Sequence, residues 1–486
     1  MLLNVLLSFL VHFTALPDTS KTVKDTLSAP GELSLKVTQN QTPLFVKEIN
    51  IEGNKRTKSF IIVRELAFKQ FDSIPAGKLA EYILQSKNNV YNLALFNFVN
   101  FDYTIQNQEV SFKIKVVERW HIWPIPQITF ADPNFNTWYE TKDLSRINFG
   151  LNTRWSNFLG KNQTVRFFIQ MGYTRQAQIK YDVPQIDKRQ KLGMSFSTAY
   201  SNNKEIVYAT KNNKRLFLFD NSKYVREEVG SEIKMIYRNR IFNSHELRLK
   251  YNYVQIDDTI RFLKNDYLPN NLTYSNYLTL EYNYRFDRRD LKFYPLKGYF
   301  IEITGTKVGL FNFNNSPDFA YLTTSLRYYK DLGKRFYFAS GGKLKLGSVL
   351  NQPYYIQQGL GNANLKTSYD IMRGYEYYII DGQSWGFVKS NFKFNLIKPR
   401  VYDISMLPVP QSSKNVFFAS YINIFFDQGY VTDRVFNAEN TLANQYLYSY
   451  GVGVDFVGSF DFVLRIEYSI NKLKENGFFL NFIAPI

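Results

Sequence analysis

The residue types that most often carry enzyme chemistry are scarce or scattered in this sequence. Cysteine is absent, which excludes disulfides, thiol catalysis, cysteine metal sites and a lipid anchor on a cysteine. The three histidines, His12, His121 and His245, lack the spacing of metal ligands. The adjacent carboxylates Asp257 and Asp258 fall in an expected loop, with no general base beside them. We therefore expect no enzymatic activity, no metal and no cofactor.

One carboxylate stands out because of the segment in which it lies. In the sequence FFDQG, Asp427 is in phase with Asn423 and opposite the apolar side chains of Ile424 and Phe426. Its charge therefore faces the polar side of a strand, where it needs a partner. An arginine would suit, because its planar fork stays charged and can bind a carboxylate through two hydrogen bonds.

This segment belongs to a long series of alternating strands. From residue 119 to residue 486, stretches of about 10 residues alternate between apolar and polar side chains, separated by turn residues. Aromatic residues make up 17% of the chain, yet the mean hydropathy is only −0.31. The pattern predicts an antiparallel transmembrane β-barrel of roughly 16 strands with a polar lumen. A soluble β-sandwich or propeller is the alternative, although no blade-length repeat is present.

The part before the barrel divides into three. Residues 1–16 have the short apolar core of a secretory signal peptide, for which a first helix of the fold is the alternative. Residues 17–43 are polar, without apolar periodicity, and indicate a flexible linker. Residues 44–118 predict a small α+β domain in the order strand, helix, helix, strand, strand. Its expected elements are a strand at 45–51, helices at 60–66 and 79–93, and strands at 98–105 and 110–117.

The chain is basic, with 60 Lys and Arg against 42 Asp and Glu, for a net charge of +18. The cations are spread singly along alternating segments rather than gathered in a basic helix or run. Lumen lining, loops and an anionic lipid surface account for such charges. We therefore expect outer-membrane lipid, and not nucleic acid, as a partner.

Several stretches resemble the outer-membrane protein assembly superfamily, which includes BamA, TamA and the two-partner secretion transporters. IEGNKRTKSFIIVREL, LFNFVNFDY and VSFKIKVVE are similar to the opening and closing parts of a POTRA domain, present here in one copy. DRRDLKFYPLKGY is similar to a turn in the middle of the family's barrel. The resemblance implies one periplasmic POTRA domain followed by a 16-stranded barrel in the outer membrane.

The strongest resemblance is the tetrapeptide MRGY, formed by Met372, Arg373, Gly374 and Tyr375. It follows the eleventh segment and resembles the (V/I)RG(F/Y) motif of the sixth extracellular loop, which folds back into the barrel. The family partner is an Asp in F-x-D-x-G on the thirteenth strand, and the matching residues here are Asp427 and Gly429. The resemblance thus implies a pair between Arg373 and Asp427 that locks the loop.

Two observations limit this interpretation of the motif. Both charged residues could instead be ordinary solvated side chains of a wide pore. Lys393 stands where many family members carry a Glu on the twelfth strand, which weakens a version of the lock with three charges.

The ends of the barrel predict a weak seam. Pro124 and Pro126 begin the first segment and lack backbone donors, while the last segment, which contains Gly477 and Phe482, is short. A closed barrel requires its first strand to pair with its last. The alternative is simple fraying at the chain ends.

The resemblance implies a factor that folds or inserts client outer-membrane proteins. The alternative is a transporter of the two-partner secretion type that moves a polypeptide through the lumen, and a third possibility is a plain porin. The expected partners are client outer-membrane or secreted polypeptides. Periplasmic chaperones or accessory lipoproteins could assist.

Overall fold

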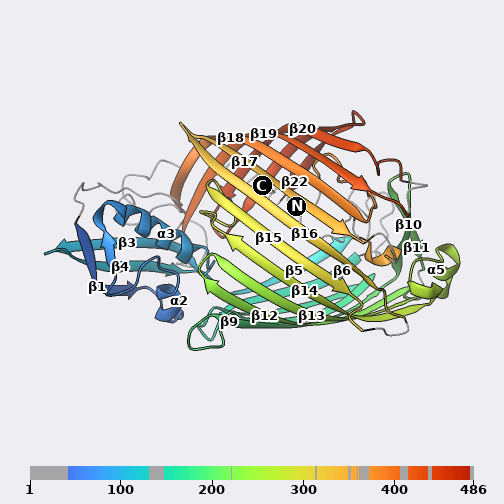
Figure 1. The fold of residues 1–486 in the computed structure, drawn as a ribbon, viewed down its shortest axis with the longest axis horizontal. Coiled ribbons are helices and arrows are strands. Elements are labelled where there is room, and N and C mark those ends of the chain that lie inside the picture. Colours follow the sequence, from blue (N-terminus) through green and yellow to red (C-terminus); the bar gives the residue numbers. More distant parts are fainter. Residues whose placement is uncertain are drawn as a thin grey trace.

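The computed structural model describes residues 42–130, 147–220, 222–311, 315–348, 352–357, 359–360, 372–404, 414–435 and 440–481. They form a small α+β domain and a large antiparallel sheet that curves into a barrel (Figure 1). The small domain lies at one mouth of the barrel, and the β10–β11 hairpin and α5 lie at the other. The expected signal peptide and almost all of the expected linker lie outside the described residues.

The small domain has the predicted order of strand, two helices and two strands. Its elements are β1 (Pro43–Glu52), α2 (Ser59–Val63), β2 (Ser73–Pro75), η1 (Ala76–Lys78), α3 (Leu79–Tyr91), β3 (Phe96–Gln106) and β4 (Glu109–Glu118). The sheet order is β2-β1-β4-β3, with β1 and β4 parallel. β2 was not predicted, because a strand of three residues is too short to show a period of two.

The barrel sheet contains 16 strands, as predicted, and each pairs with its neighbour in sequence order apart from an inserted hairpin. The strands are β5 (Ile122–Phe130), β6 (Ile147–Phe158), β7 (Gln163–Gly172), β8 (Thr174–Val183), β9 (Leu192–Asn203), β12 (Arg226–Arg240), β13 (Asn243–Ile256), β14 (Tyr274–Asp287), β15 (Gly298–Val308), β16 (Phe319–Gly333), β17 (Phe336–Gly347), β18 (Ser384–Asp403), β19 (Asn415–Thr432), β20 (Tyr446–Gly458), β21 (Val463–Asn471) and β22 (Asn476–Asn481). No helix in the described part of the chain is long and apolar enough to cross a membrane.

Alternation along the strands produces two different surfaces. On β19, Ile422, Ile424 and Phe426 are 39%, 59% and 45% exposed, whereas Asn423 and Asp427 are fully buried. Because side chains alternate across a strand, the apolar set covers the outside and the polar set faces the lumen. This is the surface pattern of a barrel surrounded by lipid.

The mouth distant from the small domain carries elements that sequence periodicity did not reveal. They are β10 (Glu205–Lys211), β11 (Lys214–Phe219), α5 (Asp258–Leu263), η3 (Pro269–Asn271) and η4 (Tyr354–Ile356). At the tip of the β10–β11 hairpin, Asn212 and Asn213 have φ values of 51° and 60°, as a two-residue hairpin turn requires. The Asn213 amide donates to Thr441 Oγ1 at 2.7 Å, so the hairpin reaches the loop before β20.

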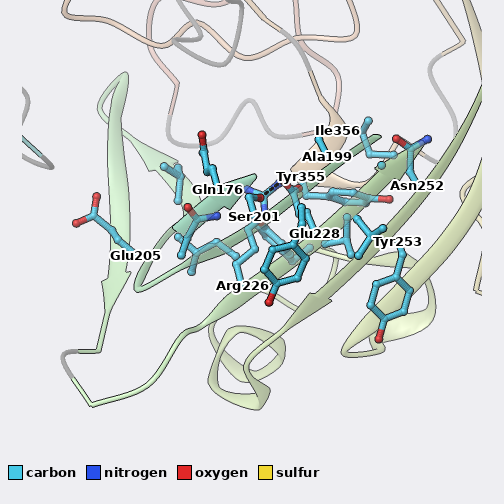
Figure 2. A pocket seen from close by; sticks show the side chains of 18 of the residues that line it. Gln176, Ala199, Ser201, Glu205, Arg226, Glu228, Asn252, Tyr253, Tyr355 and Ile356 are labelled. Atoms are coloured by element: carbon cyan, nitrogen blue, oxygen red, sulfur yellow. Dashed lines mark hydrogen bonds and ion pairs between the residues drawn. The ribbon is translucent and has the colours of Figure 1, made fainter. Parts of the chain in front are cut away.

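Beneath this hairpin lies a polar cavity of about 670 Å³. Figure 2 shows Ser201, Glu228 and Asn252 from its strand wall together with Tyr355 and Ile356 at η4. Thr210 of the hairpin forms a hydrogen bond of 2.6 Å with Tyr354. The hairpin and η4 therefore enclose the lumen at this mouth.

The small domain contacts β12 and two turns at the mouth on its own side of the barrel. Glu65 accepts two hydrogen bonds from Arg238 at 2.5 and 2.7 Å. Arg119 donates to both carboxylate oxygens of Asp461 at 3.0 and 3.2 Å. One apolar cluster runs from the domain core into the barrel, where it includes Leu291. The two units therefore share a core.

We predict that Gly53 is required by the turn after β1. Its φ is +91°, and an added Cβ would lie 2.0 Å from the Val116 carbonyl oxygen. Gly53→Ala should therefore destabilise the small domain by about 1–3 kcal/mol. Gly77 is the control, because nothing lies within 4 Å of its added Cβ and Gly77→Ala should change stability by less than about 0.5 kcal/mol. Urea-dependent proteolysis of the small domain in the full-length chain measures both, and equal stability of the two variants would contradict the prediction.

Candidate functional site

The MRGY tetrapeptide belongs to the loop that connects β17 to β18, and it lies inside the barrel. Met372, Arg373 and Tyr375 are 0%, 3% and 1% exposed. Met372 and Tyr375 belong to an apolar cluster with side chains from β18, β19 and β20. The loop is therefore packed against the lumen wall at this point.

The structure brings Arg373 and Asp427 into direct contact. Arg373 Nε donates to Asp427 Oδ2 at 2.8 Å, and a terminal guanidinium nitrogen donates to Oδ1. The backbone N–H of Arg373 also donates to Oδ2, at 3.2 Å. The guanidinium lies over the Phe425 ring, 3.9 Å from its centroid. The two residues thus form a bidentate pair that is shielded from water.

A third charge completes the arrangement, but from a different strand than the family pattern suggests. Arg373 Nη1 donates to Glu467 Oε1 on β21 at 3.1 Å and to Asn391 Oδ1 on β18 at 2.7 Å. Lys393 on β18 is not the third charge of this arrangement. The expectation that Lys393 weakens a three-charge lock is therefore corrected, because Glu467 supplies the second carboxylate.

A second buried pair lies beside the first. Arg465 donates to the two oxygens of Asp455 at 2.6 and 2.7 Å, and all of these atoms are fully buried. Arg465 also lies 3.7 Å from Glu467, which links the two pairs. Because each charge has a partner of opposite sign, the cluster tolerates burial that isolated charges would not.

The remaining motif residues allow this close approach. Gly374 has a φ of +81°, and an added Cβ would lie 3.3 Å from Cβ of Ser449. At Gly429 an added Cβ would lie 2.7 Å from the Met372 sulfur. The Tyr375 hydroxyl donates to the Tyr448 carbonyl at 3.0 Å. Because neither glycine has a side chain, the loop can lie this close to the strands.

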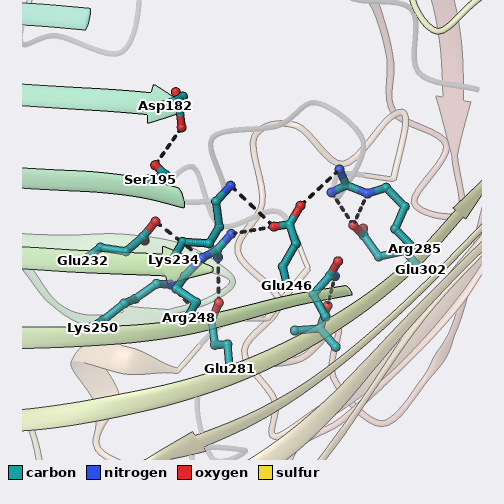
Figure 3. A network of polar contacts seen from close by, with 12 residues as sticks. Asp182, Ser195, Glu232, Lys234, Glu246, Arg248, Lys250, Glu281, Arg285 and Glu302 are labelled. Atoms are coloured by element: carbon teal, nitrogen blue, oxygen red, sulfur yellow. Dashed lines mark hydrogen bonds and ion pairs between the residues drawn. The ribbon is translucent and has the colours of Figure 1, made fainter. Parts of the chain in front are cut away.

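Charged side chains also line the lumen wall opposite this loop (Figure 3). Arg248 bonds to Glu281 at 2.7 Å and lies 3.6 Å from Glu246. Arg285 bonds to Glu302 at 2.6 Å and lies 3.8 Å from Glu246. These partly exposed pairs form a ladder across β13, β14 and β15, so this part of the wall is polar.

The residues that we considered for enzyme chemistry lie outside this buried cluster of charges. Asp257 caps α5, where hydrogen bonds from Lys223 and Thr259 lower the pKa of its carboxyl to about 2 and make it a poor base. Burial lowers the pKa of His121, which lies at the junction of the two domains. The described residues contain no group of three or more His, Asp or Glu that could hold a metal ion.

The sheet ends at β5 and β22, and across the described residues of these two strands no ladder joins them. Pro124 and Pro126 lie in β5 opposite Thr153 and Leu151 of β6. Gly477 lies in β22 and pairs with Ser469 of β21. Phe482 lies outside the described residues.

Hydrogen bonding shows which way the two prolines point. Ser156 N–H donates to the His121 carbonyl at 2.7 Å, in register with the β5–β6 pairing. Hydrogen-bonded positions alternate in an antiparallel pair, so Pro124 and Pro126 belong to the set directed away from β6. The missing donors are therefore on the open edge of β5.

Sequence reasoning missed the residues that reach the loop from other strands. Arg465 and Glu467 alternate with Leu464 and Ile466 in the sequence, which places both charges on one face, but a period of two cannot show which inward charges meet across strands. Asp455 carried no signal beyond its polarity, and Tyr294 only its place in DRRDLKFYPLKGY, the stretch that resembles a turn of the family's barrel. The register of β20 against β21, which places Asp455 opposite Arg465, supplies the missing information.

We predict strong coupling between Arg373 and Asp427. Each single change to Ala leaves the other charge buried without its partner and should cost about 3–5 kcal/mol. Removing both should add little further, so a double-mutant cycle should give a large coupling energy. Urea unfolding of the barrel in lipid vesicles provides the measurement. Arg285→Ala is the matched control on the exposed ladder and should cost at most about 1 kcal/mol, whereas additive losses at Arg373 and Asp427 would contradict the lock.

Comparison with known proteins places the chain in a family. The profile described as an Omp85 superfamily domain matches residues 157–478, and the profile described as surface antigen variable number repeat, a POTRA domain, matches residues 44–119. No curated protein matches the sequence.

Similar solved structures include two kinds of protein. BamA from Haemophilus ducreyi lacking POTRA domains 1–3 is 13% identical, with 90% of this chain and 83% of that chain covered and a TM-score of 0.48. CdiB from Acinetobacter baumannii is 12% identical, with 91% and 74% covered and a TM-score of 0.46. CdiB from Escherichia coli is 9% identical, with 94% and 92% covered and a TM-score of 0.45. Because the superfamily profile matches well over half of the sequence, the chain belongs to the Omp85 superfamily.

Proposed function

We propose that the protein is an outer-membrane assembly factor that folds or inserts client β-barrel proteins. The observation that carries this proposal is the open edge between β5 and β22 in the described residues. An unpaired strand edge presents N–H and C=O groups that can template a further strand. A client strand is the partner that such an edge fits best.

The two edges differ in the donors that they offer. Asn471 N–H donates to the Glu475 carbonyl at 3.0 Å, so in β22 the backbone groups of Phe478 and Leu480 point to the open edge. On β5, by contrast, two positions lack donors because they are Pro124 and Pro126. β22 is therefore the stronger template, and the prolines keep the seam between β5 and β22 weak.

The outer membrane is the location that these features favour. The lipid-facing side chains of the strands and the POTRA domain at one mouth support a barrel that spans that membrane, with the POTRA domain in the periplasm. Client polypeptides would then arrive from the periplasmic side. Chaperones or accessory lipoproteins could deliver them.

A transporter of the two-partner secretion type is the second candidate. The charged ladder on the lumen wall favours it, because a polar wall can accommodate an extended chain (Figure 3). Transport requires the loop that holds Arg373 to leave the lumen, whereas insertion at the seam does not. The two functions therefore differ in where the client lies.

We predict that clients contact β22 from the lipid side. Phe478 is 76% exposed, so a photo-crosslinking amino acid placed there should capture unfolded barrel precursors in intact envelopes. Tyr282, which is 49% exposed on the distant strand β14, is the control position and should capture none. A client captured from a lumen position such as Lys343, but not from position 478, would favour transport instead.

We also predict that restoring donors on β5 hinders client insertion. The double variant Pro124→Ala, Pro126→Ala adds two N–H groups to the open edge, where they can pair with β22. Each hydrogen bond should stabilise the closed seam by about 0.5–1.5 kcal/mol, so insertion should slow several-fold. Pro269→Ala, in η3 at the far mouth, is the control. Unchanged insertion rates in the double variant would contradict a role for the prolines.

A further inference from the structure

The turn between β14 and β15, residues 288–297, is placed where it could connect the POTRA domain with the buried loop. Leu291 and Tyr294 of this turn are 8% and 2% exposed, and both belong to the apolar cluster that extends into the POTRA core. The turn thus projects into the barrel mouth rather than ending at its rim.

Its outer side is held by the POTRA helix α3. The Asn92 amide, just after that helix, donates to the Asp290 carbonyl at 2.9 Å and accepts from the Lys292 N–H at 3.0 Å. The Tyr91 and Phe293 rings lie 6.1 Å apart. One asparagine therefore clamps the turn backbone on both sides, so a shift of the POTRA domain would move the turn.

Its inner side reaches the buried charges of the lumen. The Tyr294 hydroxyl donates to Asp455 Oδ2 at 2.7 Å. Its ring lies 4.4 Å from the Lys393 ammonium and 4.9 Å from the Tyr421 ring. This tyrosine thus contacts both a carboxylate and a cation in the interior of the barrel.

From Asp455 the contacts continue to the loop without a gap. Asp455 holds Arg465 through two hydrogen bonds, Arg465 lies 3.7 Å from Glu467, and Glu467 accepts from Arg373. Every charged member of this series is at most 3% exposed. Buried charge pairs have few alternative arrangements. The loss of one member therefore leaves its partner unpaired, and the partner must shift toward the next charge of the series.

We propose that Tyr294 is a positioning residue through which the docking of the POTRA domain controls whether the Arg373 loop stays in the lumen. It acts by fixing Asp455, which orients Arg465 and Glu467 around the loop arginine. A movement of the POTRA domain that withdraws the turn removes this support and releases the loop. The control arises from the series of contacts and does not depend on which client the protein serves.

A thiol beneath the loop reports this release. Ser449 is fully buried under Gly374, and its hydroxyl has no hydrogen-bond partner among the described residues, so Ser449→Cys is a mild change. The sequence has no other cysteine. The rate at which a water-soluble maleimide labels this thiol, in the folded protein in lipid vesicles, then measures how often the loop leaves.

Tyr294→Phe removes only the hydroxyl and should raise the labelling rate about ten- to hundredfold, as expected for the loss of a hydrogen bond to a charged group. Asn92→Ala, made in the POTRA domain, should raise it as well. The double variant should label no faster than the faster single variant, because both changes interrupt one series of contacts. Tyr267→Phe is the matched control at the opposite mouth, where the tyrosine is 1% exposed, and should leave the rate unchanged.

A second thiol separates release of the loop from general loosening of the barrel. Ser275 on β14 is fully buried near the far mouth, so Ser275→Cys should stay unreactive in every variant. Three results would each overturn the proposal. They are equal increases at both thiols, an unchanged rate at Ser449→Cys in the two variants, and additive effects of Tyr294→Phe and Asn92→Ala. No client is present in the experiment, so its failure would leave the proposed insertion activity untouched.

Discussion

A guanidinium that is removed from water must be surrounded by acceptors, and this requirement organises the interior of the barrel. Arg373 satisfies it with Asp427, Glu467 and Asn391, which come from β19, β21 and β18. A single side chain of the loop therefore ties three strands together. The position of the loop and the two glycines that make room for it accord with this one desolvated charge, and the neighbouring Arg465 pair adjoins it through Glu467.

The network of contacts around this charge extends to the mouth at which the POTRA domain lies. The POTRA domain is connected to the barrel by more than a linker, because it shares an apolar cluster with the barrel and bonds to β12 and to the turn 288–297. The turn 288–297 contributes side chains to this cluster and also to the buried charges. The POTRA domain and the interior of the lumen are therefore connected through packed groups, which transmit displacement better than solvated ones.

Much of the fold could be predicted from the sequence, because alternation and turn residues are local properties. They gave the number of barrel strands, the order of elements in the small domain and the inward phase of Asp427. The three-residue strand β2 and the six-residue helix α5 escaped because each is too short to show its period. The β10–β11 hairpin, with strands of seven and six residues, escaped because alternation does not show whether a strand joins the barrel sheet. Glu467, Asp455 and Tyr294 escaped for another reason: their partners are 94, 10 and 161 residues away. Only the registers between strands and the path of a turn bring them together.

The ladder on the lumen wall has a consequence for permeation. Its carboxylates, Glu232, Glu246, Glu281 and Glu302, lie among the cations Lys234, Arg248, Lys250 and Arg285, so charges of both signs alternate around the wall (Figure 3). A pore that selects ions through charged side chains needs rings of one sign, and here the opposing fields largely cancel within a few ångströms. With the loop withdrawn, the barrel would therefore conduct anions and cations with little preference, as an unselective aqueous passage rather than an ion filter.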